Sequence, residues 1–458
     1  MRKQRLLSGV LAVIIGLLFF GNRTVQAEGS WPGGPEVQAE SAIVMEANTG
    51  AVLYEKNPHQ QLYPASITKI MTTLLALENC SLDEEVTFSY NSVHKIERDS
   101  THISRDVGEI MTMEQCLYAV MLGSANDCAY AVAEHAGKGY ENFVAMMNEK
   151  AEELGCTDTH FNNPHGLTDP EHYTSAYDMA LISRAALENE TFRLITATTR
   201  YTIPVTNKHP NEETYIVNHH KMVTNYQGET AYLYKYCIGG KTGYTDLARN
   251  TLVTFAEKDG MTLICVVMKE NGIAQYTDTR KLFDHCFDNF TMWNVAENEP
   301  EYMINGAADV ELFGIAESFV DLDKNSQIVL PKGAVFSDAS YQVVEKEDEE
   351  SVVAALEYTY AGRKVGSAAI RKTNAVVKSY PFRSTEESAK GKHFVEIKAK
   401  YILMGVAAVI LLGAVGLLIY YLGNNFYIIR HRFSAKRRQK NRFKTIKSGK
   451  HSKWKTRW

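Results

Sequence analysis

PASITKIMTTLLALE, residues 64–78, places a serine and a lysine three positions apart at the start of an apolar run. Proline cannot continue a helix backwards, so Pro64 predicts that a helix over 67–78 begins near Ser66. Ser66 and Lys69 then share one helix face, within hydrogen-bonding reach. A lysine whose pKa is lowered by burial and a neighbouring cation can deprotonate a serine hydroxyl. Taken alone, the stretch fits a Ser N-cap followed by a solvated Lys better, and only the other motifs reverse that preference.

A second polar segment, Ser124-Ala-Asn126, follows an apolar helical run at 113–122. The run stops at Gly123, so the two polar side chains lie just past a helix end, where they can point into a cleft. A plain turn, or the cap of the next helix at 128–136, is the alternative reading of this segment.

The third segment is Lys241-Thr242-Gly243, which precedes strand-like runs at 251–256 and 261–268. At the edge of an antiparallel hairpin it would offer a cation, a hydroxyl and an approachable backbone. A phosphate-binding P-loop is excluded, because its pattern needs a glycine where this chain has Lys235 and a helix where strands are expected.

With these three segments, about residues 40–287 resemble the low-molecular-mass penicillin-binding proteins, the serine-type D-alanyl-D-alanine carboxypeptidases. The family's first hairpin is matched by residues 42–56, with a turn at 48–50. Residues 161–167 and 173–180 match a family stretch between the second and third motifs. The resemblance implies an α/β penicillin-binding-protein/β-lactamase-like catalytic domain, with helices on an antiparallel sheet.

The resemblance also implies catalytic roles for residues of the first two motifs. Ser66 would be the acylated nucleophile and Lys69 its general base. Ser124 and Asn126 would relay a proton to the leaving D-alanine and hold the substrate's peptide. The implied catalytic residues are Ser66, Lys69 and Ser124.

Substrate binding is implied for the third motif and its neighbour. Lys241 and Thr242 would bind the terminal carboxylate, and the backbone N–H groups of Ser66 and Tyr244 would form the oxyanion hole. The implied substrate-binding residues are Asn126, Lys241, Thr242, Gly243 and Tyr244.

The implied reaction is removal of the terminal D-alanine from peptidoglycan pentapeptides, with no metal or organic cofactor and with β-lactams as covalent inhibitors. Gln275 stands where family members often carry Arg, and the Asn-His-His-Lys segment at 218–221 replaces an asparagine-rich one. Both departures leave carboxylate affinity and substrate preference open.

Two other functions fit the same chain. Class A β-lactamases use a deacylating Glu some forty residues after the second motif, where residues 160–166 contain none. A catalytically silent cell-wall scaffold would not need the intact set of motifs. Covalent labelling by a penicillin separates the scaffold from the enzymes.

Both ends of the chain predict export and anchoring. Residues 1–27 combine a basic start, an apolar run and a small-residue cleavage site, which is typical of a signal peptide. Residues 401–422 contain no charged side chain and would rise about 33 Å as a helix, enough for one membrane crossing. The tail at 423–458 carries thirteen Lys or Arg and no Asp or Glu, which predicts that it is cytoplasmic and that the catalytic region lies outside a bacterial cell membrane.

Net charge argues against nucleic-acid binding by the exported part. Removing the thirteen positive charges of the tail and the four of residues 1–27 from the formal net of −5 leaves about −22. The tail itself fits a topology anchor on anionic lipid, or a docking arm for a cytoplasmic partner or RNA.

The remaining boundaries come from composition. We expect the catalytic domain at 28–295, a small β-sandwich at 300–380, resembling the stalk domain of the same carboxypeptidases, and a polar linker at 381–400. The strand-like runs of the second region lie at 309–313, 326–330, 341–344, 352–360 and 363–370.

Seven cysteines are scattered without a Cys-x-x-Cys pair, which favours small buried side chains over a disulfide framework. A zinc hydrolase is disfavoured because His-Glu-x-x-His does not occur.

Overall fold

The computed structural model describes residues 29–97, 99–225, 228–299, 320–345 and 352–372. The signal peptide at 1–27, the linker at 381–400, the span at 401–422 and the tail at 423–458 remain predictions, because they lie outside the described residues. Among the described helices, none combines the length and the apolar character that a bilayer crossing requires.

A five-stranded antiparallel sheet lies at the centre of the catalytic region, in the order β2-β1-β9-β8-β7. Its strands are β1 (Ser41–Glu46), β2 (Val52–Lys56), β7 (Cys237–Thr245), β8 (Arg249–Lys258) and β9 (Met261–Glu270). The two strand-like runs predicted after the third motif are β8 and β9. Both are buried along most of their length, because apolar clusters cover the sheet on both faces.

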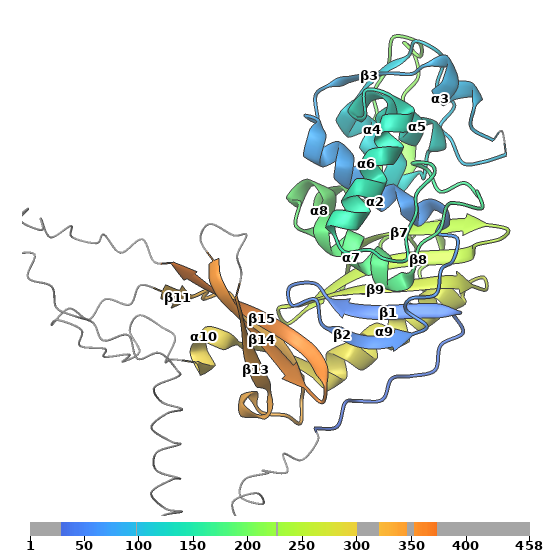
Figure 1. The fold of residues 1–458 in the computed structure, drawn as a ribbon. Coiled ribbons are helices and arrows are strands. Elements are labelled where there is room, and N and C mark those ends of the chain that lie inside the picture. The colour runs from blue at the N-terminus through green and yellow to red at the C-terminus, as the bar shows by residue number, and fades with distance from the viewer. Residues whose placement is uncertain (1–28, 98, 226–227, 300–319, 346–351, 373–458) are drawn as a thin grey trace, which may run out of the picture. The chain divides into compact units, whose positions relative to one another are not determined.

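Helices cover both faces of this sheet, as Figure 1 shows. A larger group packs on one face with Ile43, Val253 and Ile264, while α9 packs on the other with Val44, Leu252 and Leu263. Because side chains alternate between the two faces along each strand, each strand contributes to two separate hydrophobic cores. The helices are α2 (Lys69–Asn79), α3 (Tyr90–His94), α4 (Met113–Leu122), α5 (Asn126–Ala136), α6 (Tyr140–Glu153), α7 (Ala176–Leu187), α8 (Glu190–Ala197) and α9 (Ala274–Asn289).

The predicted helix at 67–78 is present but starts differently. Residues Ala65–Thr68 form a short 3₁₀ turn, η1, and α2 begins only at Lys69. Ala65 has φ +51°, and its carbonyl accepts a hydrogen bond from Thr68 Oγ1 at 2.9 Å. The nucleophile candidate therefore lies on a tight turn, which the apolar periodicity alone could not indicate.

The predicted first hairpin is confirmed as β1 and β2. The buried carboxylate of Glu46 accepts hydrogen bonds from both the backbone N–H and the hydroxyl of Thr49 at 2.7 Å. Gly50 has φ +70°, as a tight turn of this kind requires. Two small ribbons complete this region: β3 (Glu85–Thr87) with β4 (Ile110–Thr112), and β5 (Arg200–Ile203) with β6 (Thr214–Val217).

The β-rich region that follows is a single six-stranded sheet as far as its described residues go, so the expected β-sandwich is not confirmed. β15 connects the sheet by pairing with β11, β12 and β14, and two register shifts interrupt its pairing with β14. Four predicted strand-like runs correspond to β12 to β15, whereas β10 and β11 were not predicted, and such runs do not show whether strands pair into one sheet or two. The strands are β10 (Phe290–Asn294), β11 (Val320–Leu322), β12 (Gln327–Pro331), β13 (Ser340–Glu345), β14 (Val352–Tyr360) and β15 (Arg363–Lys372).

A separate apolar cluster packs on this sheet, including Ile328, Leu356 and Tyr358, together with Val295 of the short helix α10 (Val295–Asn298). β10 follows α9 directly and lies at the end of the predicted catalytic domain at 28–295, although it is a strand of the β-rich sheet. The run at 309–313 lies outside the described residues, and the predicted domain boundaries stay predictions.

Candidate active site

The first motif forms a direct contact between its two polar side chains. Lys69 Nζ lies 3.0 Å from Ser66 Oγ. The same nitrogen donates to Asn126 Oδ1 at 2.7 Å and to the backbone carbonyl of His165 at 2.6 Å. Lys69 has no exposed surface, so these three oxygens are the polar surroundings of its amine.

This geometry suits an uncharged amine that acts as a base. A neutral lysine has two N–H donors and one lone pair. Asn126 Oδ1 and the carbonyl of His165 can only accept, so they use both donors. The lone pair is then left for the Ser66 hydroxyl, whose proton it can take.

Electrostatics favour the same protonation state. Burial is the largest cause that lowers the pKa of Lys69 well below its usual value, and the positive charge of Lys241 lowers it further. The carboxylate of Asp127 acts in the opposite direction. Burial also lowers the pKa of Lys241, to about 7. With two amines buried close together, one is held neutral more easily than both are held charged.

The second motif lies where two helices meet. α4 ends at Leu122, Gly123 caps it, and α5 begins at Asn126. Ser124 between them has φ +59°, an uncommon conformation for a residue with a side chain. Its hydroxyl accepts a hydrogen bond from Lys241 Nζ at 3.1 Å, so the predicted turn is also the contact between the second and third motifs.

The third motif lies within β7, the edge strand of the sheet, as predicted for a hairpin edge. Gly243 passes so close to η1 that an added Cβ would lie 2.8 Å from Ser66 N and 2.4 Å from Thr251 Oγ1. Thr251 in turn donates to the carbonyl of Pro64 at 2.8 Å. β7 and β8 thus fix the turn that carries the nucleophile candidate.

A cavity of about 640 Å³ opens over these groups. The predicted residues that line it are Ser66, Ser124, Asn126, Thr242, Gly243 and Tyr244. Lys69 and Lys241 lie beneath it and reach it through the hydroxyls of Ser66 and Ser124. The structure therefore brings all eight predicted residues together. The amide of Ser66 lies beside β7 at Gly243, next to Tyr244, where the predicted oxyanion hole would form.

Several groups at the site lie outside the three motifs and were not predicted from the sequence. The carbonyl of His165 holds Lys69, but a backbone group leaves no signal in side-chain identities. Asp127 could have been noticed as a carboxylate next to a motif asparagine. Asn250 and Tyr276 also line the cavity, and only the folding of the sheet and α9 brings them there.

The departures noted in the sequence divide into structural and cavity-lining residues. Asn218 donates to the carbonyls of Thr196 and Thr198, which makes it a structural residue, whereas His219 and Lys221 line the cavity. Gln275 also lines it, is 7% exposed, and donates to Asn250 Oδ1 at 3.3 Å.

Gln275 Oε1 is buried and has no hydrogen-bond partner among the described residues. A substrate group that donates a hydrogen bond would remove this deficit.

Known proteins are similar to this chain in sequence and in fold. A profile of the D-alanyl-D-alanine carboxypeptidase family matches residues 26–272, which contain all three motifs. D-alanyl-D-alanine carboxypeptidase DacF of Bacillus subtilis is 31% identical over 399 residues, covering 84% of this chain and 95% of that protein. DacB2 of Mycobacterium tuberculosis, a D-alanyl-D-alanine carboxypeptidase, is 34% identical over 269 residues, covering 57% and 87%. The structure of penicillin binding protein 5 from Haemophilus influenzae matches with a TM-score of 0.60 at 26% identity, covering 76% and 99%.

Gly243→Ala should slow acylation of the protein by about 10- to 100-fold, because the new methyl group would displace Ser66 or Thr251 and misalign the nucleophile. The rate of covalent labelling by a fluorescent penicillin measures this effect. Gly333→Ala is the matched control, since an added Cβ there meets nothing within 4 Å. Equal labelling rates for the two variants would show that the close approach of β7 is not needed.

Proposed function

The chain belongs to the D-alanyl-D-alanine carboxypeptidase family, and on this premise we propose that Ser66 is the residue acylated in its reaction. The protein is a serine hydrolase that removes the terminal D-alanine of peptidoglycan pentapeptides, and penicillin sensitivity fits its fold. The observation that carries the assignment of Ser66 is its contact with the fully buried Lys69 amine.

Acylation starts at this contact. Lys69 takes the proton as Ser66 Oγ attacks the carbonyl carbon of the penultimate D-alanine. Negative charge develops on the carbonyl oxygen, where the N–H groups of Ser66 and Tyr244 stabilise it. As the peptide bond breaks, Ser124 gives its hydroxyl proton to the leaving amine and takes one back from the Lys241 ammonium, whose Nζ donates to Ser124 Oγ, and free D-alanine departs.

Recognition of the substrate's C-terminus falls to the third motif. Thr242 lines the cavity, and the buried amine of Lys241 donates to the backbone carbonyl of Thr242 at 2.8 Å. A bound carboxylate favours the charged form of Lys241 and so raises its pKa from about 7. Substrate binding thereby charges Lys241, which in turn helps to keep Lys69 neutral.

Deacylation distinguishes peptides from β-lactams. The leaving D-alanine diffuses away and opens a path for water to the acyl-enzyme. In a β-lactam the leaving amine stays tethered and obstructs this path. The segment at 160–166 has no Glu that could serve as a second base, so turnover should be fast with peptide and slow with drug.

Ser66→Ala should abolish both D-alanine release and covalent penicillin labelling, because the acyl bond is made to that oxygen. Lys69→Ala should keep the nucleophile but lose its base, which slows acylation by about 10²- to 10⁴-fold. The measurements are D-alanine released from an acyl-D-Ala-D-Ala peptide and the mass of the penicillin adduct.

The same assays separate the alternative functions. Rapid β-lactam hydrolysis without D-alanine release by the unaltered protein would support a β-lactamase. The absence of both labelling and turnover would support a wall scaffold. A stable penicillin adduct on the Ser66→Ala variant would refute the nucleophile assignment.

The location of the protein is a further part of the proposal. Export by a signal peptide at 1–27 and a single span at 401–422 would hold the catalytic domain outside the bacterial cell membrane, with the β-rich region as a spacer. The asymmetry of Lys and Arg about residues 401–422 supports this orientation.

Protease added to intact, wall-stripped cells should digest epitopes within residues 28–400 and spare those in the tail at 436–458. The expected cause is retention of the Lys- and Arg-rich tail on the cytoplasmic side. Immunoblots with tags at either position provide the measurement, and detergent-lysed cells provide the control. Protection of the catalytic region together with cleavage of the tail would reverse the proposed topology.

A further inference from the structure

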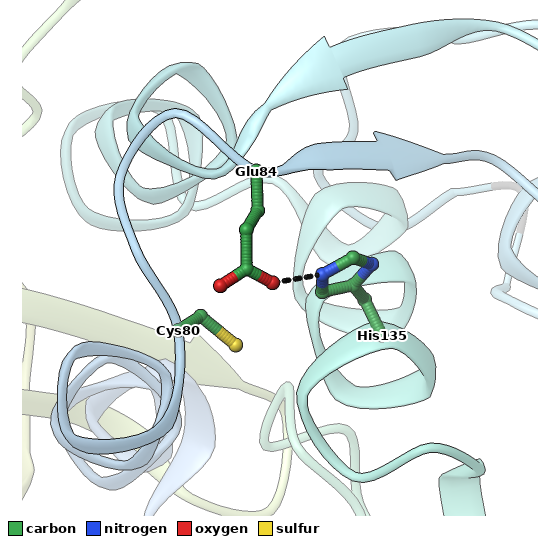
Figure 2. A group of neighbouring side chains, drawn as sticks. All are labelled: Cys80, Glu84 and His135. Atoms are coloured by element: carbon green, nitrogen blue, oxygen red, sulfur yellow. Dashed lines mark hydrogen bonds and ion pairs between the residues drawn. The ribbon is translucent and has the colours of Figure 1, made fainter.

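Away from the active site, three potential metal ligands of different chemistry lie together (Figure 2). They are the thiol of Cys80, the carboxylate of Glu84 and the imidazole of His135, and their ligand atoms all lie within 4.8 Å of one another. Glu84 Oε2 is 2.8 Å from His135 Nε2. Within the described part of the chain, this is the one such group.

Three separate elements supply these side chains. Cys80 caps the C-terminal end of α2, and Glu84 ends the loop that leads to β3. His135 lies in the last turn of α5. Since α2 and α5 pack against each other, their carboxyl ends meet at this cluster. Partial negative charge at both helix ends favours a cation there.

We propose that Cys80, Glu84 and His135 bind a Zn²⁺ ion, with a water molecule as the fourth ligand. A thiolate, an imidazole and a carboxylate together form a donor set that zinc accepts, whereas Mg²⁺ and Ca²⁺ prefer oxygen ligands alone. His135 and Glu84 have side chains 28% and 41% exposed, so an ion and a water molecule can reach the cluster from solvent.

The geometry needs only small side-chain movements to fit. Ligands at about 2.0–2.3 Å from a tetrahedral zinc ion lie about 3.3–3.6 Å apart. The Glu84–His135 contact of 2.8 Å would open by about half an ångström, and a pair at the 4.8 Å limit would close by somewhat more than 1 Å. Rotation about the side-chain bonds of Cys80 and Glu84 can supply such shifts without moving a helix.

Hydrogen bonds already orient the carboxylate. Ser81 N donates to Glu84 Oε1 at 2.7 Å, which leaves Oε2 directed at His135. The backbone carbonyl of Glu84 accepts from Met113 N at 2.8 Å, so the loop is fixed on both sides of the side chain. Support of this kind holds a ligand in place before a metal binds.

The position of the cluster indicates what the ion would do. α2 begins with Lys69 and α5 begins with Asn126, and these two side chains share a hydrogen bond of 2.7 Å. The proposed ion would fasten the opposite ends of the same two helices. Eleven residues of α2 rise about 16 Å, so the ion lies far from the reacting atoms and serves stability rather than chemistry.

Zn²⁺ titrated into the EDTA-treated full chain should raise its melting temperature by about 5 °C at a 100-fold excess over the dissociation constant, whereas Mg²⁺ and Ca²⁺ should not. Co²⁺ should produce a thiolate-to-cobalt charge-transfer band in the near ultraviolet. Penicillin labelling with and without Zn²⁺ should proceed at the same rate, since the ion does not touch the reacting groups.

Cys80→Ser should remove the cobalt band, and His135→Gln should weaken zinc binding by about 100-fold or more. Glu84→Gln keeps an acceptor for Ser81 N and tests the carboxylate charge alone. His59→Gln is the matched control, because His59 contacts Asp158 at 3.0 Å but lies outside the cluster.

Penicillin labelling of each variant confirms its fold. An unaltered protein that shows neither stabilisation by Zn²⁺ nor a cobalt band, or a Zn²⁺ response that survives in folded Cys80→Ser and His135→Gln variants, would overturn the proposal.

Discussion

The active site depends on a lysine amine that is fully enclosed in protein. Lys69 Nζ contacts Ser66, Asn126 and the carbonyl of His165, and it has no exposed surface. A charged amine in such a place loses its hydration, so the neutral form is favoured and can act as a base at neutral pH. Asn126 and His165 are 57 and 96 residues away from Lys69 in the sequence, so these two contacts exist only when distant segments have packed together.

A second buried amine, that of Lys241, allows base catalysis and anion binding to fall to different lysines. Lys241 lies under the same cavity, and its charge disfavours a charge on Lys69. One amine can therefore serve as base while the other binds an anion. The edge strand β7 makes this arrangement possible, because Gly243 lets the strand approach the turn that carries Ser66. The close approach of β7 to the Ser66 turn and the burial of the two lysine amines therefore depend on each other.

The sequence predicted the chemistry of the site better than its surroundings. The three polar segments contained seven of the eight predicted residues, and the resemblance to the carboxypeptidases implied Tyr244 and the role of each residue. The 3₁₀ turn before Lys69 and the carbonyl of His165 were not predictable, since both arise from tertiary contacts of the backbone. The resemblance to the carboxypeptidases implied the antiparallel sheet and its first hairpin, and strand-like apolar runs indicated β8 and β9. The single β-rich sheet was not predicted, because strand patterns do not specify pairing partners.

The central claim is that Lys69 is a neutral base, and its side-chain titration tests this most directly. NMR of the full chain labelled at lysine Cε and Nζ, assigned with a Lys69→Met variant, would follow that titration. We expect the pKa of Lys69 to lie well below its usual value of 10.5 and to rise in a Lys241→Gln variant, because a like charge is removed. A Lys69 that titrates near 10.5, unaffected by Lys241→Gln, would contradict the account.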